Sequence, residues 1–170
     1  VESDESEAYP RKEITWYSLI RASRKTPAAQ LAFADRLRQA GKLGRAGRAY
    51  DALVHRWHGS PEAVVAQRRY ADTLYAREKY DKAFEEYQYL VEHFAGHFAY
   101  EEVIRRQYKI ARHLMTARRG GFLIVPGFRD PDRALPLFAT VIENAPAWDE
   151  AARAQLTIGR IHEDGKDYRE

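Results

Sequence analysis

The stretches LGRAGRAYDALV at residues 43–54 and YDKAFEEYQYLV at residues 80–91 carry one pattern twice. In each, an alanine is followed four residues later by a tyrosine and seven residues later by a leucine. A third copy, ALPLFATV at residues 134–141, has phenylalanine and valine in those places. The aligned positions are Ala46, Tyr50 and Leu53; Ala83, Tyr87 and Leu90; and Ala134, Phe138 and Val141. Small residues at fixed offsets before large apolar ones indicate repeats in which two helices pack closely.

The spacing of the copies locates an insertion. Ala83 follows Ala46 by 37 residues (83 − 46), whereas Ala134 follows Ala83 by 51 (134 − 83). Most of the excess lies in RRGGFLIVPGFRD, residues 118–130, between the two helices of the third repeat. Insertions into single repeats occur in loops, and often on a functional face.

Three helix starts share one chemistry. Thr26-Pro27, Ser60-Pro61 and Asp130-Pro131 each place a side-chain oxygen before a proline. Such an oxygen accepts a hydrogen bond from an unpaired backbone N–H, and proline has no N–H to leave unpaired. Gly41 suits the left-handed residue that ends a helix.

These signals predict an all-α fold: a right-handed superhelical stack of three to four helix pairs. Residues 1–12 are polar and acidic and are expected to form a flexible tether. Residues 13–170 form the repeat domain, with a first helix over about 13–23. The repeats span about 27–60, 61–97 and 98–146, followed by a partial repeat over 147–170. Its helix is expected to run from about Trp148 to Glu163 and to end at Gly165, with a partner beginning near Tyr168. Either the fourth repeat is cut short at Glu170 or more helices follow.

Composition restricts the function classes. The chain has 170 residues, is 45% hydrophobic and 31% charged, and has a formal net charge of +3 with no cysteine. The absence of cysteine excludes disulfides, thiolate metal sites and cysteine nucleophiles. A charge of +3 is too small for a dedicated nucleic-acid binder, and no apolar run approaches the roughly 18–20 residues of a membrane span. Because the chain begins at Val1 and not at methionine, we expect a processed or truncated product, in which a removed signal or lipid-anchor segment would not be visible.

No motif indicates catalysis. GKLGRAGR at residues 41–48 lacks both phosphate-loop spacings and follows a helix where a strand is required. His93 and His97 are four residues apart, but Gly96 and a predicted helix end lie between or beside them, so we expect no metal site there. No serine stands in a nucleophile-elbow sequence. We therefore expect no catalytic residues, no metal and no cofactor.

The alanine–aromatic pattern resembles tetratricopeptide repeats, whose small residues are matched by Ala71, Ala111 and Gly159 in the first helix of successive pairs. The order of parts is also similar to the BamD (YfiO-type) outer-membrane assembly lipoproteins. That family has helices like EKYDKAFEEYQYLVEHF (78–94) and a long first helix in its third pair (100–117). It also has an insertion within a repeat and a DPxxA helix start (130–134). The chain departs from the family at His93-Phe94-Ala95-Gly96-His97, where the family often has His-Pro, and it lacks the lipidated N-terminal cysteine.

The resemblance implies a concave groove lined by the first helix of each pair. Its candidate residues are Arg68, Asp72 and Tyr75; Arg105, Tyr108 and Arg112; and Arg153, Leu156 and Arg160. Arginines interspersed with tyrosines suit an extended peptide with acidic groups or a terminal carboxylate. The alternative is that these residues are ordinary polar residues facing solvent.

The insertion contains an apolar run that is unusual for a loop. Phe122, Leu123, Ile124, Val125 and Phe128 lie between two glycines and Arg129. Either this run folds over the repeats, or it presents apolar surface to a partner or a membrane edge.

The sequence thus predicts a non-enzymatic protein-interaction scaffold. Its resemblance implies a lipoprotein subunit that supports β-barrel assembly on the periplasmic face of the outer membrane. The expected partners are a β-barrel assembly protein, other envelope proteins or extended peptide segments, with no nucleic acid. Membrane association would come only through a lipid anchor upstream of Val1. The alternatives are a periplasmic adaptor for envelope constriction or peptidoglycan machinery, and the docking arm of a larger enzyme.

Overall fold

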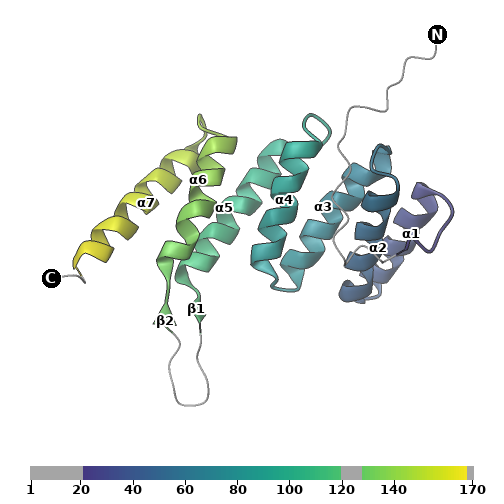
Figure 1. Cartoon of the computed structure of the whole chain (residues 1–170), viewed down its shortest axis with the longest axis horizontal. Coiled ribbons are helices and arrows are strands. Elements are labelled where there is room, and N and C mark those ends of the chain that lie inside the picture. The colour runs from purple at the N-terminus through teal and green to yellow at the C-terminus, as the bar shows by residue number, and fades with distance from the viewer. Residues whose placement is uncertain (1–20, 120–127, 168–170) are drawn as a thin grey trace, which may run out of the picture. The chain divides into compact units, whose positions relative to one another are not determined.

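The computed structural model describes residues 21–119 and 128–167, which form parts of two compact units, Val1–Tyr100 and Glu101–Glu170. The described part of the first unit holds α1 (Pro27–Gln39), α2 (Leu43–Arg56), α3 (Pro61–Ala76) and α4 (Tyr80–His93) (Figure 1). The second unit holds α5 (Tyr100–Thr116, which starts at the boundary), η3 (Pro131–Ala134), α6 (Leu135–Asn144) and α7 (Asp149–Asp167). Strands β1 (Arg118–Arg119) and β2 (Phe128–Arg129) pair antiparallel between α5 and η3. The predicted all-α class of tetratricopeptide-type helix pairs is confirmed.

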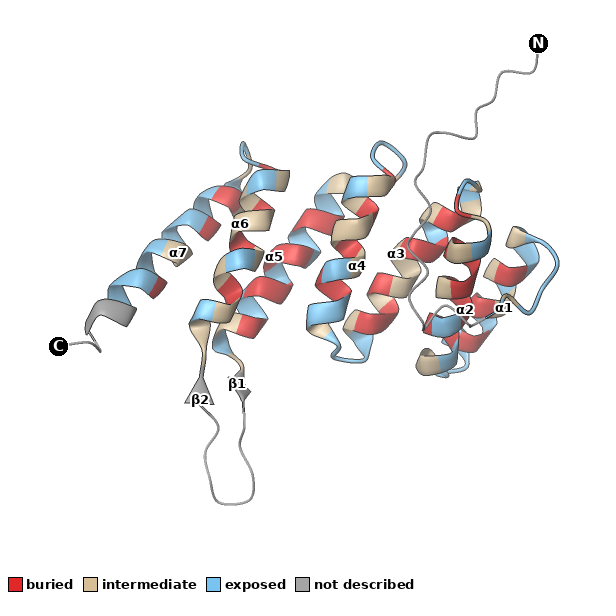
Figure 2. Cartoon of the chain, viewed as in Figure 1, coloured by how far each residue is buried: buried red, intermediate tan, exposed pale blue. Residues whose placement is uncertain are grey.

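The aligned positions of the repeat form the core. Ala46, Ala83 and Ala134 have no exposed surface, and the aromatic and aliphatic residues four and seven positions later are equally buried. In Figure 2 buried residues (red) alternate with exposed ones (pale blue) along the helices of each unit. Each alanine is therefore enclosed in the packed core, where the sequence pattern placed a small residue.

Two hydrogen bonds recur in the first unit with the repeat period. Nε2 of Gln30 donates to the carbonyl oxygen of Ala49 at 2.9 Å, and Nε2 of Gln67 donates to that of Glu86 at 2.9 Å. Both glutamines are almost fully buried. Each ties the first helix of a pair to the second, so these bonds fix the register of the pair.

The second recurring bond joins a tyrosine to an aspartate. The Tyr50 hydroxyl donates to Asp35 at 2.6 Å, and the Tyr87 hydroxyl donates to Asp72 at 2.5 Å. Arg69 of α3 also donates to Asp35, at 2.5 Å, which links the second pair to the first. Burial, with the Asp35 bond second, raises the pKa of Tyr50 above its usual value.

The third pair, in the second unit, closes differently. Gln107 is again fully buried, but its Oε1 accepts from Nδ2 of Asn144 on α6 at 3.1 Å. The rings of Tyr108 and Phe138 lie with centroids 5.9 Å apart. Arg105 of α5 pairs with Glu150 of α7 at 3.6 Å. Polar contacts therefore hold α5 against both α6 and α7.

The predicted helix starts are only partly right. Thr26 Oγ1 accepts from the N–H of Ala29 at 3.3 Å, as expected, but neither Ser60 nor Asp130 makes a side-chain capping bond. The segment at Pro131 begins as a 3₁₀ turn, because Pro136 has no N–H to continue an α-helical ladder from residue 132. Gly41 has φ +71°, which confirms the predicted left-handed end of α1.

Three further expectations are wrong in the described residues. Residues 21–23 are not helical, because Ser23 and the backbone N–H of Arg24 turn onto Oε1 of Gln30. Helix α7 continues past Gly165 to Asp167, since a glycine weakens a helix by only about 1 kcal/mol and need not end it. Gly159 is exposed, and Ala154 supplies the small buried residue of that helix instead. The tether 1–12, residues 13–20 and the helix start near Tyr168 lie outside the described residues.

The buried alanine crossing gives a stability test. Ala83→Leu inserts three carbons where Ala83 has no exposed surface, so overpacking should lower the free energy of unfolding by about 1–3 kcal/mol. Urea denaturation would measure it. Glu85→Leu, at an exposed position of the same helix, is the control and should change stability little. An Ala83→Leu protein as stable as the parent would show that the crossing is not close-packed.

Candidate functional site

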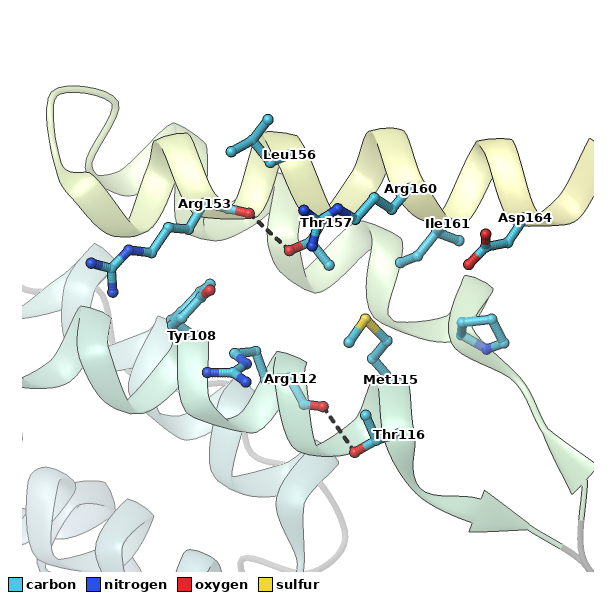
Figure 3. A pocket seen from close by; sticks show the side chains of 11 residues that line it. Tyr108, Arg112, Met115, Thr116, Arg153, Leu156, Thr157, Arg160, Ile161 and Asp164 are labelled. Atoms are coloured by element: carbon cyan, nitrogen blue, oxygen red, sulfur yellow. Dashed lines mark hydrogen bonds between the residues drawn. The ribbon is translucent and has the colours of Figure 1, made fainter.

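A groove of about 890 Å³ opens between α5 and α7 of the second unit (Figure 3). Helix α5 and the start of η3 contribute one wall, and α7 contributes the other. The lining residues are Tyr108, Arg112, Met115, Thr116, Pro131, Arg153, Leu156, Thr157, Arg160, Ile161 and Asp164. This volume lies in the range of sites that bind small molecules or peptide side chains.

The groove differs in chemistry along its length. In Figure 3, Arg153 reaches from α7 toward Tyr108, with Arg112 beside it on α5. Farther along the helices, Met115 and Ile161 lie toward one another, and Asp164 follows Ile161. One part is therefore basic and aromatic, and the other is apolar with a carboxylate at its end.

The three arginines of the groove form no ion pair with another described residue. No carboxylate within 4.0 Å of Arg112, Arg153 or Arg160 is found in the described ranges 21–119 and 128–167. The Arg112 guanidinium lies 6.0 Å from the centroid of the Tyr108 ring. Three guanidinium groups and one carboxylate leave a net positive charge on the groove wall. Such groups provide forked donors that match carboxylate oxygens.

A comparison of the three helix pairs shows how Arg112 comes to line the groove. An aspartate stands five residues after the buried glutamine in the first two pairs, as in Gln30–Asp35 and Gln67–Asp72, but Arg112 stands five after Gln107. At the matching tyrosine position the third pair has Phe138, which has no hydroxyl to donate. The third pair therefore lacks both the tyrosine and the aspartate of this hydrogen bond. Where the first two pairs have an aspartate that accepts the bond, the third has an arginine that lines the groove.

The structure brings together five of the nine groove candidates: Tyr108, Arg112, Arg153, Leu156 and Arg160. Leu156 is 67% exposed. Arg105 lies outside the groove lining and pairs with Glu150 and, at 3.8 Å, with Glu101.

The other candidates remain predictions. Arg68, Asp72 and Tyr75 lie on α3 of the first unit, where Asp72 accepts the Tyr87 hydroxyl and the Tyr75 ring contacts Tyr80. Of the loop candidates, Phe122, Leu123, Ile124 and Val125 lie outside the described residues. Phe128 is described only as a backbone position of β2.

Sequence reasoning missed part of the lining. Met115 and Thr116 follow Arg112 by three and four residues, and Asp164 follows Arg160 by four. They continue the predicted faces by one helical turn, so extending the same spacing would have found them. Pro131 could not be found this way, because it comes from a segment beyond the insertion.

The first unit holds smaller cavities and a buried histidine. The cavities measure about 190 and 140 Å³. His58 is buried: its ring stacks on Phe94 with centroids 4.8 Å apart, and its Nε2 contacts the Tyr89 hydroxyl at 2.7 Å. Burial, with Glu86 second, raises the pKa of Tyr89 to about 12.

Metal and membrane features were also sought in the described residues. No group of three or more histidine, aspartate or glutamate side chains is arranged to hold a metal ion there. In the same residues no helix combines the length and apolar character needed to span a bilayer.

Comparison with known proteins supports the repeat. Residues 31–97 match the family model of the tetratricopeptide repeat. The chain is similar to a crystal structure of a Podosopora anserina putative kinesin light chain with nearly identical TPR-like repeats. Identity is 17%, the TM-score is 0.41, and the match covers 89% of this chain and 72% of that one. No curated protein matches the sequence.

Restoring a tyrosine at position 138 and an aspartate at position 112 tests whether these positions are equivalent to those of the first two pairs. Phe138→Tyr adds a hydroxyl to a fully buried ring in the pair that has Arg112 in place of the aspartate acceptor, and should cost about 1–3 kcal/mol of stability. The double change Phe138→Tyr with Arg112→Asp recreates the pair found at Tyr87 and Asp72, and should recover most of that loss. Thermal or urea unfolding of the two single variants and the double variant measures the coupling. Additive effects would show that the positions are not equivalent to those in the first two pairs.

Proposed function

We propose that this protein is a non-enzymatic scaffold that binds a peptide segment of another protein in the α5–α7 groove. The observation that supports this most is a groove with three arginines that lack carboxylate neighbours in the described residues, beside a leucine that is 67% exposed. Buried internal structure does not require either feature. Arginine and tyrosine are enriched among the residues that contribute most to protein–protein binding.

We further propose that it works in the bacterial cell envelope, as part of the machinery that inserts outer-membrane β-barrels. This proposal is supported by the order of parts that resembles BamD-type lipoproteins. A 17-residue α5 is followed by the insertion, whose ends pair as β1 and β2, and then by Asp130-Pro131 and the buried Ala134. In this role the groove would hold a partner segment at the periplasmic face of the outer membrane.

Photocrosslinking in the native cell tests both levels of the proposal. A photoreactive amino acid replaces Thr157, which lines the groove, or Lys109, which is exposed on α5 and does not line it. Mass spectrometry then identifies the partner and the crosslinked segment. We expect a β-barrel assembly protein from the Thr157 protein, and none from the Lys109 protein.

A charge reversal sharpens the result. Arg112→Glu should abolish the Thr157 crosslink, whereas Lys109→Glu should leave it intact. Crosslinks only to soluble proteins outside the envelope, or to peptidoglycan enzymes, would contradict the role in β-barrel assembly. They would still agree with the function as a scaffold. Equal crosslinking from Thr157 and Lys109 would contradict the groove as the binding site.

A further inference from the structure

We propose that the first unit has a membrane-contact surface of its own, which binds the phosphate headgroups of an anionic lipid bilayer. We call this surface the basic face, and it consists of Arg21, Arg24, Arg45 and Arg48. The proposal goes beyond the scaffold function, because it concerns the first unit and does not involve the α5–α7 groove.

Positive charge is concentrated at the start of the described chain. Residues 21–48 contain eight arginines and lysines and one aspartate, a net charge of +7. The whole chain has a net charge of only +3, so the remaining residues together have a net charge of −4 (3 − 7). All eight cations are exposed. The small overall charge therefore combines one strongly basic region with an acidic remainder, and the field of such a region attracts anionic partners.

The fold does not neutralise this charge. Asp35, the one acidic residue within 21–48, already accepts hydrogen bonds from the Tyr50 hydroxyl and from Arg69 of α3. None of the eight cations has a carboxylate oxygen within 4.0 Å among residues 21–119 and 128–167. Within the described structure their charge is therefore balanced by solvent or by a ligand.

A cavity of about 190 Å³ gathers the basic face around one point. Arg21 lines it from the segment before α1, and Arg45 and Arg48 line it from α2. The Arg24 guanidinium lies 4.4 Å from the centroid of the Phe33 ring, which also lines the cavity. No aspartate or glutamate is found among the described residues of the lining. Guanidinium groups brought together from separate segments supply forked donors for phosphate oxygens.

The chemistry of this surface fits a lipid headgroup better than a protein partner. Leu37, Ala49 and Ala52 line the same cavity but are 9%, 6% and 3% exposed, so little apolar area is left for a partner to cover. Protein–protein interfaces usually have an apolar centre. Attraction to an anionic bilayer instead requires only cations close to its surface.

The surface also lacks what a single-stranded nucleic acid would need. Phe33 is the one aromatic residue within 21–48, and its ring lies against the Arg24 guanidinium. The basic face therefore offers no free aromatic ring on which bases could stack. A bilayer makes no such demand, and it is the partner to which the proposal commits.

Cosedimentation of the full chain with lipid vesicles tests the proposal. Vesicles that contain phosphatidylglycerol mixed with phosphatidylcholine are compared with vesicles of phosphatidylcholine alone. We expect binding to the anionic vesicles and none to the neutral ones at about 0.1 M salt. Because salt screens exposed charges, binding should weaken by about tenfold or more at about 1 M salt.

Protein variants assign the binding to the basic face. Each cation close to an anionic bilayer strengthens binding by about fivefold. Arg45→Glu combined with Arg48→Glu should therefore weaken binding by at least about tenfold. Lys79→Glu combined with Lys109→Glu makes the same change in net charge at exposed positions outside the face, and should leave binding within about threefold.

A conservative pair of variants separates charge from folding. Arg45→Lys combined with Arg48→Lys keeps both charges, so it should bind the anionic vesicles within about threefold of the parent. Circular dichroism confirms that each variant is folded. Loss of binding in the lysine protein as large as in the glutamate protein would show that the charge of the face is not what binds.

Three other outcomes would overturn the proposal. Equal binding to neutral vesicles would exclude the charge of the headgroups as the cause. An equal loss in the two glutamate double variants would assign binding to the net charge of the chain and not to the basic face. Tighter binding of an oligonucleotide than of vesicles, at equal phosphate concentration, would make the face a nucleic-acid site. No partner protein is present in these measurements, so their failure would leave the scaffold function untouched.

Discussion

The burial of one alanine in each helix pair is the constraint on which the rest of this protein depends. Ala46, Ala83 and Ala134 have no exposed surface, and a larger side chain at any of them would displace the atoms packed around it. In the first two pairs a buried glutamine of the first helix reaches a carbonyl oxygen of the second helix and fixes the register. That register then determines which side chains of the first helix remain outside the core. The groove residues are a consequence of this arrangement.

Within one repeated frame, the residue five positions after the buried glutamine either accepts an internal hydrogen bond or lines the groove. In the first two pairs the residue five after the buried glutamine accepts a tyrosine hydroxyl. In the third pair both bonding groups are exchanged, and the helix pair is held instead by Asn144 on Gln107 and by the aromatic contact of Tyr108 with Phe138. The arginine at this position then lines the groove, and no carboxylate of the described residues lies within 4.0 Å of it. The third pair can lack the tyrosine–aspartate hydrogen bond because the burial of its alanine does not depend on that bond.

Sequence reasoning reached the fold because its signals are local and periodic. The alanine, aromatic and aliphatic positions recur at helical spacing, and all nine prove to be fully buried. Five of the nine groove candidates line one groove for the same reason, since residues three and four apart share a helix face. The tyrosine–aspartate bonds, the role of Pro131 and the burial of His58 depend on residues distant in sequence. No local spacing predicts them. Whether a helix ends at Gly165 or continues through it depends on a small difference in free energy.

The antiparallel pairing of β1 with β2 makes the insertion a module that can be exchanged. Arg118 pairs with Arg129 and Arg119 with Phe128, so the chain leaves the helix pair and returns to it at points about 5 Å apart. The entropy of closing a loop across such a gap grows only slowly with its length. Evolution can therefore lengthen, shorten or replace what lies between residues 119 and 128 without disturbing the crossing of α5 and α6. The helix pairs supply a constant frame, and this gap supplies a place at which related chains can diverge.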